Sequence, residues 1–206
     1  MPRTRSRPKT EEKFQNAVLK LVAKEGCSAL GINAVSQLAG ADKVLIYRYF
    51  GDFNGLLQQV AESRQWLPNN QEVLQSLGEN WSDPLSLLRR IATFLSQHIR
   101  NDASTHQLVR WRRSSACPLC RQFTEEWREL WRHLPAALSS KCNSQQRQAW
   151  KHACTLLALT IEAELCDETI DNQCLEHIAK DLQSLQDTNA QLRYTASEES
   201  LPTNLL

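Results

Sequence analysis

Glycine and proline are scarce in this chain, which has six Gly and seven Pro among 206 residues. They lie between segments in which apolar residues recur every three or four positions, the spacing of one helix face. No segment keeps the apolar–polar alternation that is typical of a half-buried strand. The chain is therefore predicted to be all-α, and sheet-containing folds are excluded.

Long apolar runs are missing as well. The longest nearly apolar stretch, residues 153–161, is far shorter than the roughly 20 residues that cross a bilayer. Met1 is followed by a basic polar segment and not by the apolar core of a secretory leader. Seven cysteines without such a leader indicate reduced thiols. A cytoplasmic protein without a membrane partner is therefore expected.

The sequence also lacks a catalytic set. No nucleophile, base and orienting group come together in a motif, so an enzyme is the least favoured class and no cofactor is predicted. Cys117 and Cys120 form a C-x-x-C motif, which occurs in redox pairs and as half of many zinc sites. No second C-x-x-C and no paired histidines follow it. No metal site is therefore predicted, and two small packed thiols are the simpler interpretation.

Basic charge is concentrated at one end of the chain. The net charge is only +1, but residues 1–50 hold nine basic and four acidic side chains. A basic end on a mildly acidic body is typical of a protein that contacts DNA at that end. Within residues 1–9, which are predicted to be disordered, Arg3, Arg5 and Arg7 form a basic arm. The arm either follows DNA phosphates or is a solvated tail.

Residues 31–57 contain the most informative pattern. A short helix is predicted over residues 32–39, and Gly40 can take the left-handed conformation that ends it. Asp42 can then cap a second short helix over residues 43–49. Two helices joined by so tight a turn cross steeply, which is the geometry that places the second helix in a DNA major groove.

This segment resembles the N-terminal DNA-binding domain of the TetR family of bacterial transcriptional regulators. The resemblance covers about the first quarter of the chain. It is carried by an Ala-Gly turn and a following Tyr-x-Tyr-Phe block, formed by Ala39, Gly40, Tyr47, Tyr49 and Phe50.

Gly31 replaces the usual capping Thr or Ser of the family, and two positions that usually contact phosphate depart from the family pattern as well. Leu45 stands where the family usually has Thr, and Phe53 where it usually has Lys. Neither side chain can bond a phosphate. These departures leave open a helical interaction module whose head has lost its affinity for DNA.

The resemblance implies a division of the chain and a mechanism. The expected parts are a helix-turn-helix DNA-binding domain at residues 1–52, a helical regulatory and dimerisation domain at residues 53–189, and a frayed polar tail at residues 190–206. A small-molecule effector in the body would move the helix expected at residues 54–66 and release a repressor from its operator. A thiol- or metal-responsive regulator on the same scaffold is the alternative.

Residues that contact DNA are expected on one face of the second short helix. Ile46 and Phe50 are apolar and four residues apart, so they are predicted to face the core. By resemblance, Lys43, Val44 and Arg48 would meet base edges. Tyr47 and Tyr49 would hold phosphates with their hydroxyls, pack half-buried, or do both. The predicted DNA-contacting set, with one candidate from the preceding helix, is Asn33, Lys43, Val44, Tyr47, Arg48 and Tyr49.

The rest of the chain is predicted to be a helical body. Pro84 and Pro118 are each expected to open a helix, and Pro135 is expected to end one. Resemblance implies that helices at residues 145–166 and 171–186 pair with those of a second subunit in a homodimer. Alternatively, these helices complete the monomer core.

A small-molecule pocket is expected among the middle helices, because aromatic walls suit apolar or planar ligands. Core packing explains the same aromatic residues equally well. The candidate ligand-binding residues are Phe94, His98, Trp111, Trp127, Trp131 and Trp150.

Overall fold

The computed structural model describes residues 7–78, 84–112, 117–139 and 144–165. Within these ranges all regular structure is helical, which confirms the all-α prediction. The helices are α1 (Arg7–Glu25), the 3-10 helix η1 (Cys27–Ala29), α2 (Ile32–Ala39), α3 (Val44–Phe50), α4 (Phe53–Glu62), α5 (Asn70–Leu77), α6 (Pro84–Asn101), α7 (Ala103–Trp111), α8 (Pro118–Leu138) and α9 (Ser144–Leu165). The predicted helix at residues 171–186, the tail at 190–206 and most of the basic arm lie outside the described residues.

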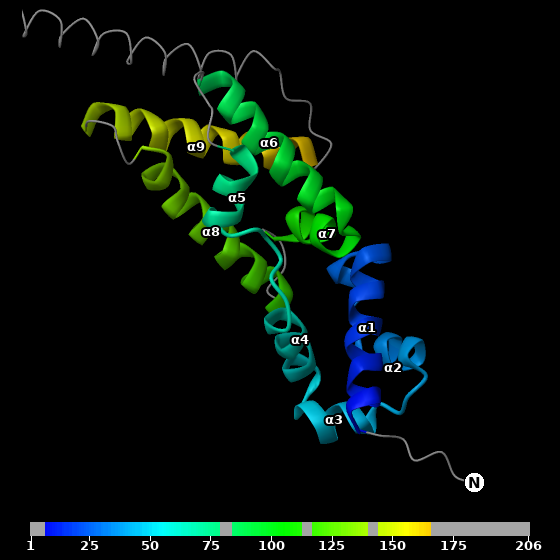
Figure 1. Ribbon diagram of the computed structural model, residues 1–206. Coiled ribbons are helices and arrows are strands. Elements are labelled where there is room, and N and C mark those ends of the chain that lie inside the picture. Colours follow the sequence, from blue (N-terminus) through cyan, green and yellow to red (C-terminus); the bar gives the residue numbers. More distant parts are fainter. Residues whose placement is uncertain (1–6, 79–83, 113–116, 140–143, 166–206) are drawn as a thin grey trace, which may run out of the picture.

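The described part of the molecule is elongated (Figure 1). Helices α1 to α3 lie at one end, here called the head, and α5 to α9 lie at the other end, here called the body. At the junction between them, α1 and η1 pack against α7, and α4 packs against α8. Among the described helices, none combines the length and the apolar character needed to cross a bilayer.

The first helix begins earlier than predicted. Residues 1–9 were expected to be a disordered arm, but α1 starts at Arg7. Pro8 is compatible with this start because the N–H that proline lacks would have no helical partner in the first turn. An ion pair of 2.7 Å between Arg7 Nε and Glu11 Oε1, one turn apart, also favours the helical conformation.

The head has its own apolar core. Phe14 and Val18 of α1, Val35 of α2 and Ile46 of α3 are fully buried. Phe14 also meets Phe50 edge to face, with ring centroids 6.2 Å apart. Burial of these side chains supplies the main force that holds α2 and α3 against α1.

The turn between α2 and α3 follows the sequence prediction. Gly40 ends α2 in the left-handed region, at φ 61° and ψ 37°. Asp42 Oδ1 accepts a hydrogen bond of 2.9 Å from the Val44 N–H, which lies in the first turn of α3. Helix α3 begins one residue later than predicted, at Val44.

One predicted feature of the body is wrong, the end of α8. Before it, α6 ends at Asn101, and Asp102 caps a separate helix, α7, by accepting from the Thr105 N–H. Helix α8 was expected to end at Pro135 but continues to Leu138. Pro135 has no N–H, so α8 lacks the one hydrogen bond that this residue would donate and continues beyond it. Its carbonyl still accepts from the N–H and the hydroxyl of Ser139, at 3.0 and 2.6 Å.

Candidate nucleic-acid interface

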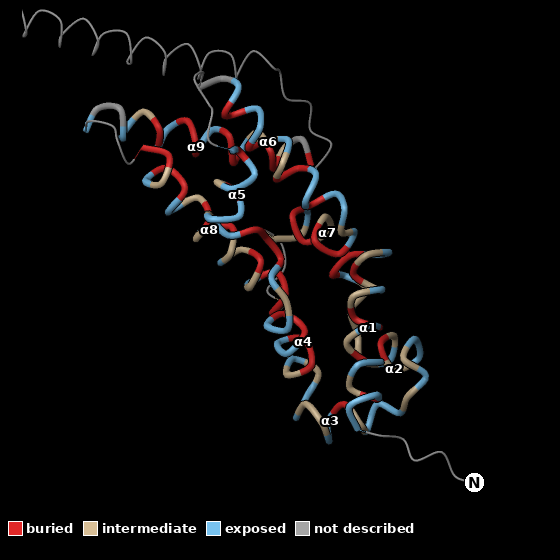
Figure 2. Tube along the Cα trace, in the orientation of Figure 1, coloured by how far each residue is buried: buried red, intermediate tan, exposed pale blue. Residues whose placement is uncertain are grey.

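Helix α3 separates a buried face from an exposed one. Ile46 is fully buried, whereas Val44 is 61% exposed and Tyr47 is 55% exposed. Arg48 is exposed as well, and Val44, Tyr47 and Arg48 share a face because they are three and four residues apart. Figure 2 shows α3 as largely exposed or half-buried around one buried position. Core packing therefore does not account for the side chains of this face.

The other predicted DNA-contacting residues lie near this face or beside it. Lys43, just before α3, and Asn33, early in α2, are both exposed. Tyr49 is half-buried. The guanidinium carbon of Arg7 lies 5.2 Å from the Tyr49 ring centroid, a cation–π distance. Arg7 thus connects the start of α1 to α3, a contact that the arm interpretation did not anticipate.

The two departures from the family pattern have a packing role. Leu45 and Phe53 are partly buried against the apolar core. Burying these side chains stabilises the head. This packing explains why residue 45 is Leu and not Thr, and why residue 53 is Phe and not Lys.

Helices α3 and α4 approach each other very closely where the chain turns from one to the other. Asp52 caps α4 by accepting from the Gly55 N–H at 2.6 Å. A Cβ atom on Gly55 would lie only 2.1 Å from the carbonyl oxygen of Phe50, the last residue of α3. The absence of a side chain at Gly55 therefore determines how closely, and in which direction, α3 approaches α4.

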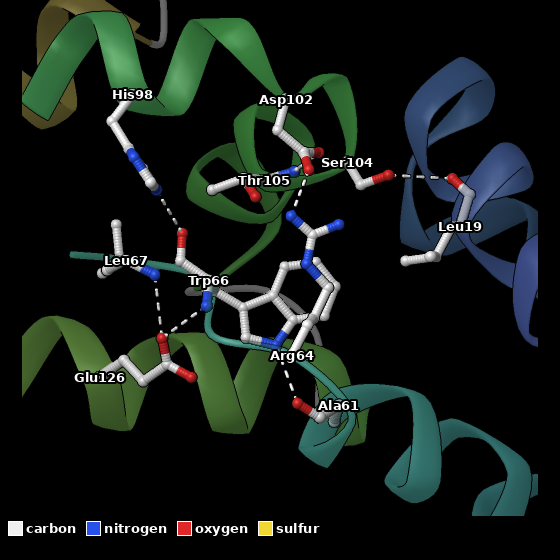
Figure 3. A network of polar contacts seen from close by, with 10 residues as sticks. All are labelled: Leu19, Ala61, Arg64, Trp66, Leu67, His98, Asp102, Ser104, Thr105 and Glu126. Atoms are coloured by element: carbon white, nitrogen blue, oxygen red, sulfur yellow. Dashed lines mark hydrogen bonds and ion pairs between the residues drawn. The ribbon is translucent and has the colours of Figure 1, made fainter.

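Residues 63–69, here called the linker, join α4 to the body and contain a buried tryptophan (Figure 3). The Trp66 side chain is fully buried, and its Nε1–H donates to the Ala61 carbonyl at 2.9 Å. Arg64 lies over the Trp66 ring, with its guanidinium carbon 4.7 Å from the centroid, and forms an ion pair with Asp102. The linker is therefore anchored to the start of α7.

The same linker is bonded to two further helices of the body (Figure 3). One carboxylate oxygen of Glu126, in α8, accepts from the N–H groups of Trp66 and Leu67 at 2.8 and 2.9 Å. His98 Nε2, in α6, donates to the Trp66 carbonyl at 3.2 Å. Hydrogen bonds to a charged acceptor are stronger than neutral ones. A change in the body that moved Glu126 would consequently move the end of α4.

The carboxyl group of Asp102 has a lowered pKa. Burial alone raises the pKa of this carboxyl, but hydrogen bonds from the Thr105 N–H and from Arg64 outweigh that effect. The net result is a pKa below the ordinary value of 3.8. The next residue but one, Ser104, donates its hydroxyl to the Leu19 carbonyl of α1 at 3.1 Å. The start of α7 thus contacts both the linker and the head.

Asp102→Asn is expected to reduce stability mainly above pH 3.8, the ordinary pKa of this carboxyl. Asn can still cap α7, so the substitution removes chiefly the charge that pairs with Arg64. Because folding lowers the pKa, the carboxylate stabilises the fold above its unfolded value, and this contribution is lost as the pH falls through the folded value. Melting temperatures of the original protein and of Asp102→Asn, measured from below to above pH 3.8, test the prediction. A difference in melting temperature that is equally large below this pH would contradict it.

The six predicted ligand-binding residues are distributed over four helices of the described body, α6 to α9. Trp127 and Trp131 pack edge to face in α8 with centroids 5.8 Å apart, and Trp150 is buried in α9. His98 bonds the linker, Phe94 is half-buried in α6, and Trp111 lies against Gly26. A cavity of about 450 Å³ between the linker and α8 is lined by none of the six, whereas Trp111 lines another of about 440 Å³.

One group of side chains that the sequence did not connect is a set of three thiols, here called the thiol cluster. Cys117 and Cys120 lie at the start of α8, and Cys27 of η1 lies beside them. Hydrogen bonding with Cys117 and Cys120, and then burial, raise the pKa of the Cys27 thiol far above its ordinary value. The C-x-x-C spacing was the only available signal, because Cys27 and Cys120 are 93 residues apart in the sequence.

These features define a class of fold: a helix-turn-helix head joined through one helix and a linker to a helical body. Among solved structures, the chain is similar to HlyIIR, a hemolysin II transcriptional regulator, with a TM-score of 0.56 and 17% identity over 85% of this chain and 98% of HlyIIR. An HlyIIR variant with a linker in place of one segment has a TM-score of 0.54, at 16% identity over 85% of this chain and 96% of the variant. The chain thus shares the all-helical fold of HlyIIR, with a helix-turn-helix at the place where its sequence motif predicts one.

A weaker likeness is to a candidate TetR-family transcriptional regulator from Rhodococcus sp. Its TM-score is 0.47, at 18% identity over 86% of this chain and 98% of that protein. No family model matches the sequence, and no curated protein matches it.

Proposed function

We propose that this protein is a DNA-binding transcriptional regulator that inserts α3 into the major groove. The observation that carries the proposal is the exposed face of Val44, Tyr47 and Arg48 opposite the buried Ile46. Arg suits the O6 and N7 atoms of guanine, and a valine methyl suits the methyl group of thymine. A tyrosine hydroxyl can hold a phosphate. The fold shared with HlyIIR, which is named as a transcriptional regulator, supports the same class.

The proposal assigns residues 1–52 to DNA binding and residues 53–189 to regulation and dimerisation. Leu156 and Leu159 of α9 are 43% and 49% exposed, although the neighbouring Leu157 and Ile161 are fully buried. A second copy of this chain would cover this apolar face, and the resulting dimer would present two heads to a two-fold operator. Sedimentation equilibrium tests the dimer. A monomer at concentrations that saturate the operator would contradict it.

In the proposed mechanism, a small-molecule effector changes the position of α4 and releases a repressor from its operator. The cavity of about 450 Å³ that Arg64, Leu67 and Glu126 help to line falls within the usual size range of ligand pockets. A ligand there would compete for the groups that hold the linker. Coupling of about 1–3 kcal/mol between the two sites would be enough for regulation. No catalytic step is part of this proposal.

Selection of genomic fragments by the purified protein tests DNA binding directly. Enrichment of fragments with a common two-fold sequence, and affinity that falls steeply with salt, would support the proposal. Failure to retain any fragment over random competitor DNA at low salt would favour the alternative of a helical interaction module.

Arg48→Ala is expected to weaken binding to the selected operator by about 1–3 kcal/mol, because a base contact by Arg contributes about this much. The loss should be smaller on random DNA, where base contacts do not contribute. Gel-shift titration on both DNAs measures it. Arg128→Ala is a matched control, because Arg128 is an exposed residue of α8 in the body. Equal losses for the two variants, or none for Arg48→Ala, would remove Arg48 from the contact set.

A further inference from the structure

The thiol cluster brings together sulfur atoms from the head and from the body. The Sγ atoms of Cys117 and Cys120 are 3.4 Å apart, and those of Cys27 and Cys120 are 3.5 Å apart. All three sulfur atoms lie within 4.8 Å of one another. Two of these residues come from the first turn of α8 and its cap, and the third comes from η1.

These separations suit a shared metal ion. Metal–thiolate bonds of about 2.3 Å place two sulfur atoms of a tetrahedral site about 3.8 Å apart. A disulfide, by contrast, needs about 2.05 Å and would use only two of the three thiols. Small side-chain adjustments would therefore convert the thiol cluster into a three-sulfur site, with a fourth position open to another ligand.

The surroundings of Cys117 also suit a metal-bound thiolate. Cys27 and Cys120 are buried, whereas Cys117 is half-buried and provides access from solvent. Cys117 is the N-cap residue of α8, and its sulfur accepts from the Cys120 N–H at 3.5 Å. The positive end of the helix dipole stabilises negative charge at this position.

The position of Cys27 is held by the packing beside it. Gly26, which precedes η1, has φ 78°, and a Cβ atom there would lie 2.4 Å from Nε1 of Trp111. The indole of α7 thus occupies the space next to Gly26. This close contact keeps η1, and with it Cys27, against the body.

We propose that Cys27, Cys117 and Cys120 bind one soft, thiophilic metal ion of the class of Zn²⁺, Cd²⁺ or Cu⁺. Thiolates select ions of this kind over hard cations such as Mg²⁺. Each thiol loses its proton to solvent as its sulfur–metal bond forms, so three protons are released and no electron is transferred. A bound ion would tie η1 of the head to the first turn of α8.

The regulatory part of this inference depends on the proposed function. An ion that binds one arrangement of head and body more tightly than another shifts the protein toward that arrangement. The effect on DNA affinity equals that difference in metal affinity, and typical couplings are about 5–150-fold. We infer that occupancy of the thiol cluster changes operator affinity within this range.

Titration with Cd²⁺ under reducing conditions tests the site without DNA. The Cys142, Cys166 and Cys174 positions are first replaced by Ser, so that these other thiols of the chain do not bind the ion. We expect one Cd²⁺ per chain, thiolate-to-cadmium absorption in the ultraviolet, and about three protons released per ion. X-ray absorption at the cadmium edge should count three sulfur ligands. Two or fewer sulfur ligands would overturn the proposal, whatever the behaviour of the variants.

Cys27→Ser is expected to reduce Cd²⁺ affinity at least about tenfold, because it removes one ligand of a preformed site. Cys154→Ala is the matched control, since Cys154 is a buried thiol of α9 outside the cluster. It should leave the affinity unchanged. Circular dichroism confirms that each variant is helical, and Cys27→Ala provides a second test if Cys27→Ser does not fold. Unchanged affinity in a folded Cys27 variant would overturn the three-thiol site.

Operator titrations test the metal site and the proposed DNA-binding function independently of each other. Metal-free protein that binds its selected operator supports the proposed function, independently of Cd²⁺. A change in operator affinity on adding Cd²⁺, absent from Cys27→Ser, would support the regulatory inference. Cd²⁺ binding with unchanged operator affinity would overturn the regulatory inference and leave the metal site. Operator binding without any Cd²⁺ binding would overturn the site alone.

Discussion

Replacing Gly55 with alanine is expected to destabilise the protein and to weaken operator binding. Ala normally stabilises a helix by up to about 1 kcal/mol relative to Gly, so helix propensity predicts the opposite sign. The Cβ atom, however, would lie 2.1 Å from the Phe50 carbonyl oxygen, a backbone atom that cannot rotate away. The α3–α4 corner must open, at a cost of about 3 kcal/mol, the upper end for overpacked sites. Urea unfolding and gel-shift titration measure the two effects.

Gly31→Ala is the control for this experiment. A Cβ atom on Gly31 would meet nothing within 4 Å, and its φ of −155° is open to any residue. The unfolding free energy of Gly31→Ala should be lower by no more than about 1 kcal/mol, because Ala is a weaker cap for α2 than Gly. If Gly55→Ala were as stable as Gly31→Ala, the close approach of α3 to α4 would not exist as described.

Trp66→Ala is expected to lower the free energy of unfolding by about 3–5 kcal/mol, the usual loss for a buried tryptophan. The side chain is fully buried, lies under the guanidinium of Arg64 and donates to the Ala61 carbonyl. Operator affinity should fall as well, because the linker that positions α4 loses its anchor. Urea unfolding gives the first effect, and gel shifts on folded protein give the second.

Trp66→Phe separates packing from polar contacts at the same position. Phe retains most of the apolar contact but has no N–H for the Ala61 carbonyl. Loss of that hydrogen bond should cost about 1–2 kcal/mol, well below the loss for Ala. Similar losses in both variants would assign the anchor to the N–H group. A loss below about 1 kcal/mol for Ala, the typical value for an ordinary substitution, would contradict the anchoring role of Trp66.

The helix-turn-helix was predictable because its signals are local. Gly40 supplies a backbone conformation that few residues adopt, and Asp42 accepts a hydrogen bond from the first N–H of the helix that begins two residues later. The spacing of Ile46 and Phe50 placed the core face correctly for Ile46, although Phe50 is only half-buried. Local rules were less reliable where packing opposes them. Pro135 did not end α8, because the helix loses only the hydrogen bond that this residue would donate and continues to Leu138.

Contacts between distant segments were not predictable from one sequence. The bond between the Glu126 carboxylate and the linker joins positions about sixty residues apart, and nothing in the local pattern identifies the partner. The same holds for Cys27 and the C-x-x-C motif. The aromatic residues of the body show a second limit of prediction from one sequence. Their composition predicted burial for Trp127 and Trp150, but composition contains no information on which side chains share a cavity.

The paired junction between head and body has a geometric consequence. With α1 and η1 held against α7 and α4 held along α8, the head is attached to the body on two sides. Displacement of α4 alone would tilt the head about the contact between α1 and α7. Helix α3 lies at the far end of the molecule from the body (Figure 1), so a small shift at residues 63–69 would produce a larger displacement of the surface proposed to contact DNA.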